Sequence, residues 1–440
     1  MRKLFLLTLM TCFLVQGKAT NLYNDEDSLM QWFSDAKLGV FIHWGIYSTG
    51  KTSESWAFHN KQISHQDYMA QINEFTAQQY NPAQWVDLIK ISGARYAVIT
   101  SKHHDGVALW NTKMNKLSIP KASPAKRDVL TPFVNELRKA DLKVGLYYSL
   151  IDWSYPDYPG FLNDSSRYKI QDEPNRWAEF LKFCHSQISE LLTQYNPDLM
   201  WFDGDWEHSA DEWQAPIIQQ MIKKNNPKTI INGRLKGYGD YDTPEQNIPV
   251  SRPNLKNWEL CMTTNESWGY YIGDKNYKTP YEIISIFAEC ISMGGNLLLD
   301  IGPKADGTIP AEQTHLLFEL GQWNKKHEEA IFGTIPGLPL GRFYGPTTLS
   351  KDSSSLFLFL QGNQRGNVII KGLINSIKRI EVVGNGQELE HKVVGKISWS
   401  HVPGLVYIDI PEGVQDKYMT VIKVVLDKPV SLYKGKGGFD

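Results

Sequence analysis

The chain has few cysteines and almost no net charge. Only four of its 440 residues are cysteine, and they lie far apart, at positions 12, 184, 261 and 290. This spacing excludes a fold stapled by several disulfides and argues against a cysteine-based metal cluster. With a formal net charge of −2, the sequence gives no electrostatic reason to expect nucleic acid or an anionic membrane as a partner.

Long apolar runs are also absent after the N-terminus, so no membrane span is expected. Residues 1–19 are typical of a secretory signal peptide, because two basic residues precede the apolar run 4–15 and small residues follow it. We therefore expect export to a periplasmic, extracellular or lysosome-like space. Cys12 follows Thr11, which is larger than the residue that a lipoprotein cleavage site normally has there, so soluble export is favoured over a lipid anchor.

No internal repeat is present, and no glycine-rich phosphate loop follows the first predicted strand. From about residue 28 to 333, apolar strands alternate with amphipathic helices, which predicts parallel strands joined by helical crossovers. Seven strands are predicted, at residues 38–43, 96–100, 143–148, 199–202, 229–232, near 258, and 296–301. Helices are predicted at residues 82–92, 129–140, 176–195 and 280–293. Several strands end in polar or aromatic residues, which is typical of the active face of a (β/α)8 barrel, although such a barrel has one strand more.

After about residue 335 the pattern changes to short alternating runs separated by turn residues. The runs lie at residues 356–360, 367–370, 377–383, 405–410 and 419–425. They predict a small all-β sandwich that packs on the preceding domain or binds sugar. The expected fold is therefore α/β, a (β/α)8-like TIM barrel over residues 20–335 followed by a smaller C-terminal all-β sandwich over residues 336–440.

The strongest indication of chemistry is the segment 201–206 (WFDGDW), where a predicted buried strand ends in two carboxylates framed by tryptophans. Aspartate is depleted in strands and costly to desolvate, so packing alone does not account for it. Tryptophan offers an apolar face to a sugar ring, and a carboxyl group can act on a glycosidic bond. Trp201, Asp203 and Asp205 point to one side while the strand lasts. The alternative is a strand followed by an acidic helix cap.

Five ordered motifs resemble the retaining α-L-fucosidases of glycoside hydrolase family 29, over most of residues 30–335. They are residues 41–45 (FIHWG), 101–106 (SKHHDG), 201–203 (WFD), 258–259 (WE) with 267–270 (SWGY), and 294–303 (GGNLLLDIGP). The resemblance implies an exo-acting enzyme that hydrolyses terminal α-L-fucose from fucosylated oligosaccharides or glycoproteins through a covalent fucosyl-enzyme intermediate. No cofactor is implied. Hydrolysis of another sugar, such as α-L-galactose, is the enzymatic alternative, and a catalytically silent fucose-binding protein is the alternative outside enzymes.

The resemblance implies that Asp203 is the nucleophile, with Asp205 as its competitor within the same motif. A retaining glycosidase also needs a second carboxyl group roughly 5–5.5 Å away, which starts protonated and later acts as a base. Glu245, in a Gly- and Pro-rich segment after the fifth strand, is the first candidate for this acid/base. Glu259, in the WE motif, is the second, and its alternative role is to hold the floor of the pocket. Glu54 is a distant third.

Several residues match positions that bind the sugar in the family. The expected hydroxyl-binding histidines are His43, His103 and His104, and the expected pocket residues are Trp56, Tyr148, Trp201 and Arg234. An apolar notch of aromatic side chains favours a deoxy sugar such as fucose. Ser55 stands directly before Trp56, where the family typically has a glutamate, so a sugar contact by Glu54 is in doubt. The chain lacks a helical His-x-x-x-His pair, and no metal site is predicted.

Overall fold

The computed structural model describes residues 25–253, 256–362, 364, 366–397, 399 and 401–435. The expected signal peptide, residues 1–19, lies outside this part of the chain. Among the described residues, no helix is both long enough and apolar enough to cross a membrane.

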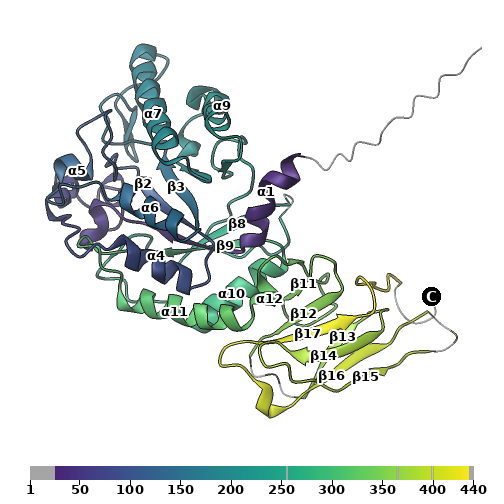
Figure 1. The fold of residues 1–440 in the computed structure, drawn as a ribbon. Helices are drawn as coiled ribbons and strands as arrows, with labels where there is room; N and C mark the ends of the chain where they lie inside the picture. Colours follow the sequence, from purple (N-terminus) through teal and green to yellow (C-terminus); the bar gives the residue numbers. More distant parts are fainter. Residues whose placement is uncertain are drawn as a thin grey trace, which may run out of the picture.

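A curled, seven-stranded parallel sheet forms the centre of the first domain (Figure 1). Its strands are β1 (Leu38–Ile42), β2 (Tyr96–Lys102), β3 (Lys143–Ser149), β6 (Leu199–Asp203), β7 (Ile230–Ile231), β8 (Glu259–Thr263) and β9 (Asn296–Ile301). They lie in the order β7-β6-β3-β2-β1-β9-β8. Almost every residue in them is buried, which explains their continuous apolar character. Each of the seven predicted strands corresponds to one of them.

An irregular segment, residues 240–246, spans the gap between the two edge strands, β7 and β8. Isolated parallel bridges join Asn232 to Tyr241 on one side, and Asp242 to Trp258 and Glu245 to Cys261 on the other. The segment cannot form a regular strand, because Pro244 has no N–H to donate and Gln246 has a left-handed φ of 61°. It takes the place of the barrel strand that the sequence did not show, and it carries Glu245.

Helices cover the outside of the sheet. The six longest after the first strand are α4 (Pro82–Ile91), α6 (Leu130–Lys139), α7 (Pro174–Tyr195), α9 (Ala215–Asn225), α10 (Pro280–Ser292) and α11 (Ala311–Lys326). The other helices are α1 (Asp25–Ala36), α2 (Trp56–His59), α3 (His65–Ala70), α5 (Ile119–Ala122), α8 (Ala210–Trp213) and α12 (Glu328–Ile331), and a short hairpin joins β4 (Gly160–Leu162) to β5 (Ser165–Ser166). Successive strand residues alternate between these helices and the barrel interior. Phe202 therefore belongs to the outer core, whereas Trp201 belongs to the inner one.

The second domain consists of two antiparallel sheets. One contains β10 (Ile335–Pro336), β11 (Thr347–Leu349), β12 (Ser355–Leu360), β17 (Thr420–Leu426) and β14 (Ile377–Val382), and the other contains β13 (Gly366–Lys371), β16 (Leu405–Ile410) and β15 (His391–Val394). Leu358 and Ile422 from the first sheet share a core with Ile370 and Ile408 from the second. The two sheets therefore pack face to face, as the alternating pattern predicts.

The five-stranded sheet packs on outer helices of the barrel, and Figure 1 shows it beside α10, α11 and α12. The Trp323 indole N–H on α11 donates to the carbonyl of Met419 at 2.8 Å. Thr348 donates to the carbonyl of Ala330 on α12 at 2.7 Å. These buried hydrogen bonds fix the second domain against the outside of the barrel.

Candidate active site

A cavity of about 200 Å³ is formed by side chains at the carboxyl ends of the barrel strands. Its eleven lining residues are Phe41, His43, Trp56, His103, Tyr147, Trp201, Asp203, Trp206, Arg234, Glu245 and Trp268. They come from strand ends and the loops after them: Asp203 is the last residue of β6, and Arg234 follows β7. This is the face on which (β/α)8 barrels carry their catalytic groups.

Asp203 lies deep in this cavity and is only 8% exposed. Its Oδ2 accepts a hydrogen bond from the Tyr147 hydroxyl at 2.9 Å, and its Oδ1 accepts one from Arg234 Nη1 at 2.9 Å. His104 Nε2 lies 3.7 Å from Oδ2. The Tyr147 and Arg234 contacts are both donors, so this environment suits an ionised carboxylate.

Arg234 also holds the second carboxylate of the cavity. Its Nη2 donates to Glu245 Oε2 at 2.5 Å, and its guanidinium lies 4.8 Å from the centre of the Trp201 ring. Burial alone lowers the pKa of Arg234, but the charges of Asp203 and Glu245 outweigh it, and the pKa lies above its ordinary value. One permanently charged guanidinium therefore links a buried carboxylate to a carboxylate whose side chain is 39% exposed.

The other carboxylates considered from the sequence lie outside the cavity lining. Asp205 Oδ2 accepts the Lys236 backbone N–H at 2.8 Å. Glu54 is buried, and its Oε1 accepts the Gly269 N–H at 2.5 Å. Burial raises the pKa of Glu54 above its ordinary value. Of the two aspartates in the WFDGDW segment, only Asp203 lines the cavity.

Glu259 lies inside the barrel behind the Trp201 ring, and it does not line the cavity. Its carboxyl group accepts hydrogen bonds from the Tyr96 hydroxyl at 2.5 Å, the Trp201 indole N–H at 2.9 Å and the Tyr241 hydroxyl at 3.2 Å. Burial raises the pKa of Glu259 to about 7, although these three donors oppose the shift. Its contacts fix the position of Trp201.

In each of the three expected histidines, the Nδ1 atom forms a hydrogen bond with another side chain. The pairs are His43 with Asp300 Oδ1 at 2.6 Å, His103 with Ser55 Oγ at 2.7 Å, and His104 with Ser149 Oγ at 2.6 Å. Burial lowers the pKa of all three well below the ordinary value, so the rings are neutral at neutral pH. His43 and His103 line the cavity, whereas His104 lies behind it, beside Asp203.

Ser149 orients the His104 ring. The Ser149 Oγ lies 2.6 Å from His104 Nδ1 and 2.8 Å from the carbonyl oxygen of Ile151. With the ring held at Nδ1, His104 Nε2 lies 3.7 Å from Asp203 Oδ2. Ser149 therefore fixes the position of His104 beside Asp203.

We expect Ser149→Ala to lower kcat/KM by roughly tenfold, because His104 loses its orienting partner and its buried Nδ1 is left unpaired. Hydrolysis of an aryl α-L-fucoside would measure this effect, with thermal unfolding followed in parallel. Ser118→Ala is the matched control, because the Ser118 hydroxyl is buried and has no hydrogen-bond partner among the described residues. Unchanged kcat/KM in Ser149→Ala would show that this positioning of His104 is not needed.

The structure does not bring Tyr148 to the cavity. Register pairs Tyr147 with Trp201 and Ser149 with Asp203, so Tyr147 faces the barrel interior. Tyr148 faces outward, and its hydroxyl donates to Gln187 on α7 at 2.9 Å. The expected tyrosine position is therefore occupied by its neighbour, which the sequence did not single out.

Three further aromatic residues line the cavity that were not among the expected pocket residues: Phe41, Trp206 and Trp268. Phe41 packs against Trp201 at 4.9 Å and against Trp268 at 6.0 Å between ring centres. All three lie within or next to the motifs of the sequence, which marked the segments but not the direction of each side chain. In the part of the chain that the structure describes, no group of three or more His, Cys, Asp or Glu could hold a metal ion.

Comparison with known proteins identifies the family. The family described as alpha-L-fucosidase matches residues 16–329. Tissue alpha-L-fucosidase from Homo sapiens is 29% identical over 424 residues, which cover 88% of this chain and 86% of that protein. The structure of alpha-L-fucosidase isoenzyme 1 from Paenibacillus thiaminolyticus matches with a TM-score of 0.83 and 30% identity, covering 92% of this chain and 100% of that one. A trapped covalent intermediate of a GH29 alpha-L-fucosidase from Bacteroides thetaiotaomicron matches with a TM-score of 0.81 and 26% identity, covering 91% and 96%. The chain therefore belongs to the alpha-L-fucosidase family.

Proposed function

We propose that the protein is an exo-acting, retaining α-L-fucosidase that hydrolyses terminal α-L-fucose from oligosaccharides or glycoconjugates. The observation that carries this proposal is the pair of carboxylates, Asp203 and Glu245, held by the single guanidinium of Arg234 in one cavity. A retaining glycosidase needs two carboxyl groups roughly 5–5.5 Å apart. Two carboxylates that share one guanidinium lie close enough together to act on one glycosidic bond, and the covalent intermediate trapped in the Bacteroides thetaiotaomicron relative favours the retaining arrangement.

In the proposed first step, Asp203 attacks the anomeric carbon of fucose while Glu245 donates a proton to the departing glycosidic oxygen. The C–O bond to the leaving group breaks as the bond to the Asp203 carboxylate forms. In the second step, Glu245 takes a proton from water, and the water oxygen displaces Asp203. Each step inverts the anomeric carbon, so the product retains the α configuration. The trapped covalent intermediate of the Bacteroides thetaiotaomicron relative supports this route.

The cavity supports a single terminal deoxy sugar as the substrate. Its volume of about 200 Å³ is below the roughly 300–1,000 Å³ of pockets that enclose drug-sized ligands. Phe41, Trp201 and Trp268 form an aromatic wall suited to the methyl group of fucose. The extra hydroxyl of α-L-galactose would lack a partner against this wall, which favours the fucoside. A silent binding protein would not need the second carboxylate.

We further propose that the barrel, residues 20–335, is the catalytic domain and that the C-terminal sandwich, residues 336–440, supports it from outside. All eleven cavity residues belong to the barrel. The N-terminal sequence favours export, which would bring the enzyme to glycans outside the cytoplasm.

The proposal is tested by incubating the protein with an aryl α-L-fucoside and following the sugar by proton NMR. Retention predicts that α-L-fucose appears first and then equilibrates with the β anomer. If β-L-fucose appeared first, the enzyme would invert and the covalent intermediate would be wrong. If only the aryl α-L-galactoside were cleaved, the assigned substrate would be wrong.

A further inference from the structure

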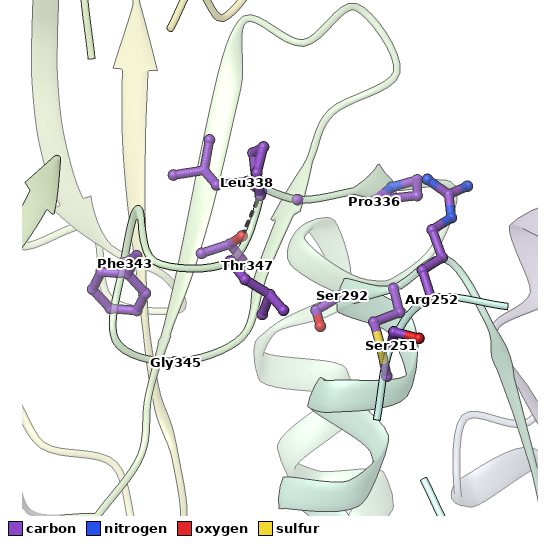
Figure 2. Close-up of a pocket in the computed structure, with 12 residues that line it drawn as sticks. Ser251, Arg252, Ser292, Pro336, Leu338, Phe343, Gly345 and Thr347 are labelled. Carbon is purple, nitrogen blue, oxygen red and sulfur yellow. Dashed lines mark hydrogen bonds between the residues drawn. The ribbon is translucent and has the colours of Figure 1, made fainter. Parts of the chain in front are cut away.

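A hollow of about 290 Å³ lies between the two domains, outside the catalytic cavity. Figure 2 shows it between Arg252 and Ser292 on the barrel side and Leu338 and Phe343 on the other. Nothing in the described residues indicates what would occupy it.

Two of the eleven cavity residues, Trp206 and Glu245, are exposed, while the others are buried or half-buried. Trp206 is 46% exposed, and the Glu245 side chain is 39% exposed. These two side chains therefore border the opening through which the rest of a glycan must pass. Glu245, the proposed acid, donates its proton to the oxygen that joins fucose to that glycan. The sugar that is bonded to fucose must therefore lie beside Glu245, at this opening.

The backbone around Trp206 is firmly held. Trp206 lies in a short 3₁₀ turn, residues 205–207, directly after Asp203 and Gly204. The carbonyl of Asp205 accepts the Trp213 indole N–H at 3.0 Å, and Glu207 Oε1 accepts the Trp153 indole N–H at 3.0 Å. Both neighbours of Trp206 are thus anchored inside the barrel loops. Its exposure is imposed by a fixed backbone.

The Trp206 ring is also held in orientation. It lies nearly parallel to the Trp56 ring, with 6.1 Å between centres and 17° between planes. It meets the His104 ring edge to face, at 5.8 Å and 84°. His104 in turn lies beside Asp203. The Trp206 ring therefore presents a large apolar face at the mouth of the cavity, next to the reacting groups. Burying this ring would stabilise the fold, so its exposure has an energetic cost.

We propose that Trp206 is a stacking platform for the sugar bonded to fucose in the substrate. This inference rests on the proposed function. The cavity has room for one sugar, so the next residue lies at the mouth, between Glu245 and Trp206. A pyranose presents C–H groups on one face, which can pack on an indole while its hydroxyl groups stay in water. Trp206 would thereby favour glycans over fucosides with a small leaving group.

The test compares two substrates in Trp206→Ala: a fucosyl disaccharide, and α-L-fucosyl fluoride, whose leaving group has no face to stack. We expect kcat/KM to fall roughly tenfold more for the disaccharide than for the fluoride, mainly through KM. Trp206→Tyr should recover most of the loss. Trp399→Ala, at an 85% exposed tryptophan of the second domain, is the matched control and should show no difference between substrates.

An equal fall for both substrates in Trp206→Ala would overturn the inference, because it would place Trp206 in the fucose site or in folding. No fall for either would also overturn it. If the unmodified enzyme failed to hydrolyse the fluoride, the proposed function itself would be wrong, so the two failures are distinguishable.

Discussion

Asp203→Ala is expected to lower kcat for an aryl α-L-fucoside by about four orders of magnitude or more, because no other group can form the bond to the anomeric carbon. The substitution also leaves Arg234 Nη1 and the Tyr147 hydroxyl without their acceptor. Arg234 keeps Glu245, so its charge remains paired and the fold should survive. Thermal unfolding would verify this.

Added azide makes the Asp203→Ala result more specific. Azide can enter the space left by the carboxylate and attack the α-fucoside from that side, which inverts the anomeric carbon once. The expected product is β-L-fucosyl azide. Asp205→Ala is the control, because Asp205 faces the Lys236 backbone outside the cavity lining and should keep most activity. Full activity in Asp203→Ala, or its loss in Asp205→Ala alone, would contradict the assignment.

The regular part of the fold could be predicted because apolar runs of strand length alternate with amphipathic helices. The irregular segment 240–246 could not be, since it contains Pro244 and mostly polar residues, and its strand-like position depends on the two neighbours that it bridges. Glu245 was proposed as the acid because it lies in a Gly- and Pro-rich segment after the fifth strand. Its link to Asp203 through Arg234 is a contact between residues far apart in sequence.

The sequence alone did not show which way individual side chains point. Alternation showed that Tyr147 and Tyr148 face opposite sides of a strand, but only the register against Trp201 shows which one faces inward. The sequence also did not show how far along its strand each carboxylate lies. Glu259 is the first residue of β8, whereas Asp203 is the last of β6. Both carboxylates point into the barrel but at different levels along it, and only Asp203 lies at the carboxyl ends of the strands, where the cavity is.

Glu245→Gln should have a large effect that depends on the leaving group. For a fucosyl disaccharide, whose leaving oxygen needs a proton, we expect kcat/KM to fall by roughly 10²–10⁴-fold. For a dinitrophenyl α-L-fucoside, whose leaving group needs little acid, the fucosyl-enzyme should still form and its hydrolysis should become slow. Azide needs no general base, so it should accelerate turnover. Because this route inverts twice, the expected product is α-L-fucosyl azide.

Glu259→Gln separates the two acid candidates. The Glu259 carboxyl accepts three hydrogen bonds, whereas an amide has a single oxygen to accept them, so we expect the substitution to destabilise the fold by about 1–3 kcal/mol. We expect a lower melting temperature, a similar loss for both leaving groups, and no azide product. Formation of α-L-fucosyl azide by Glu259→Gln and not by Glu245→Gln would move the acid/base to Glu259. For that outcome Glu259 would have to reach the substrate in the cavity. In the structure it does not line the cavity, and it accepts a hydrogen bond from the Trp201 indole, which does.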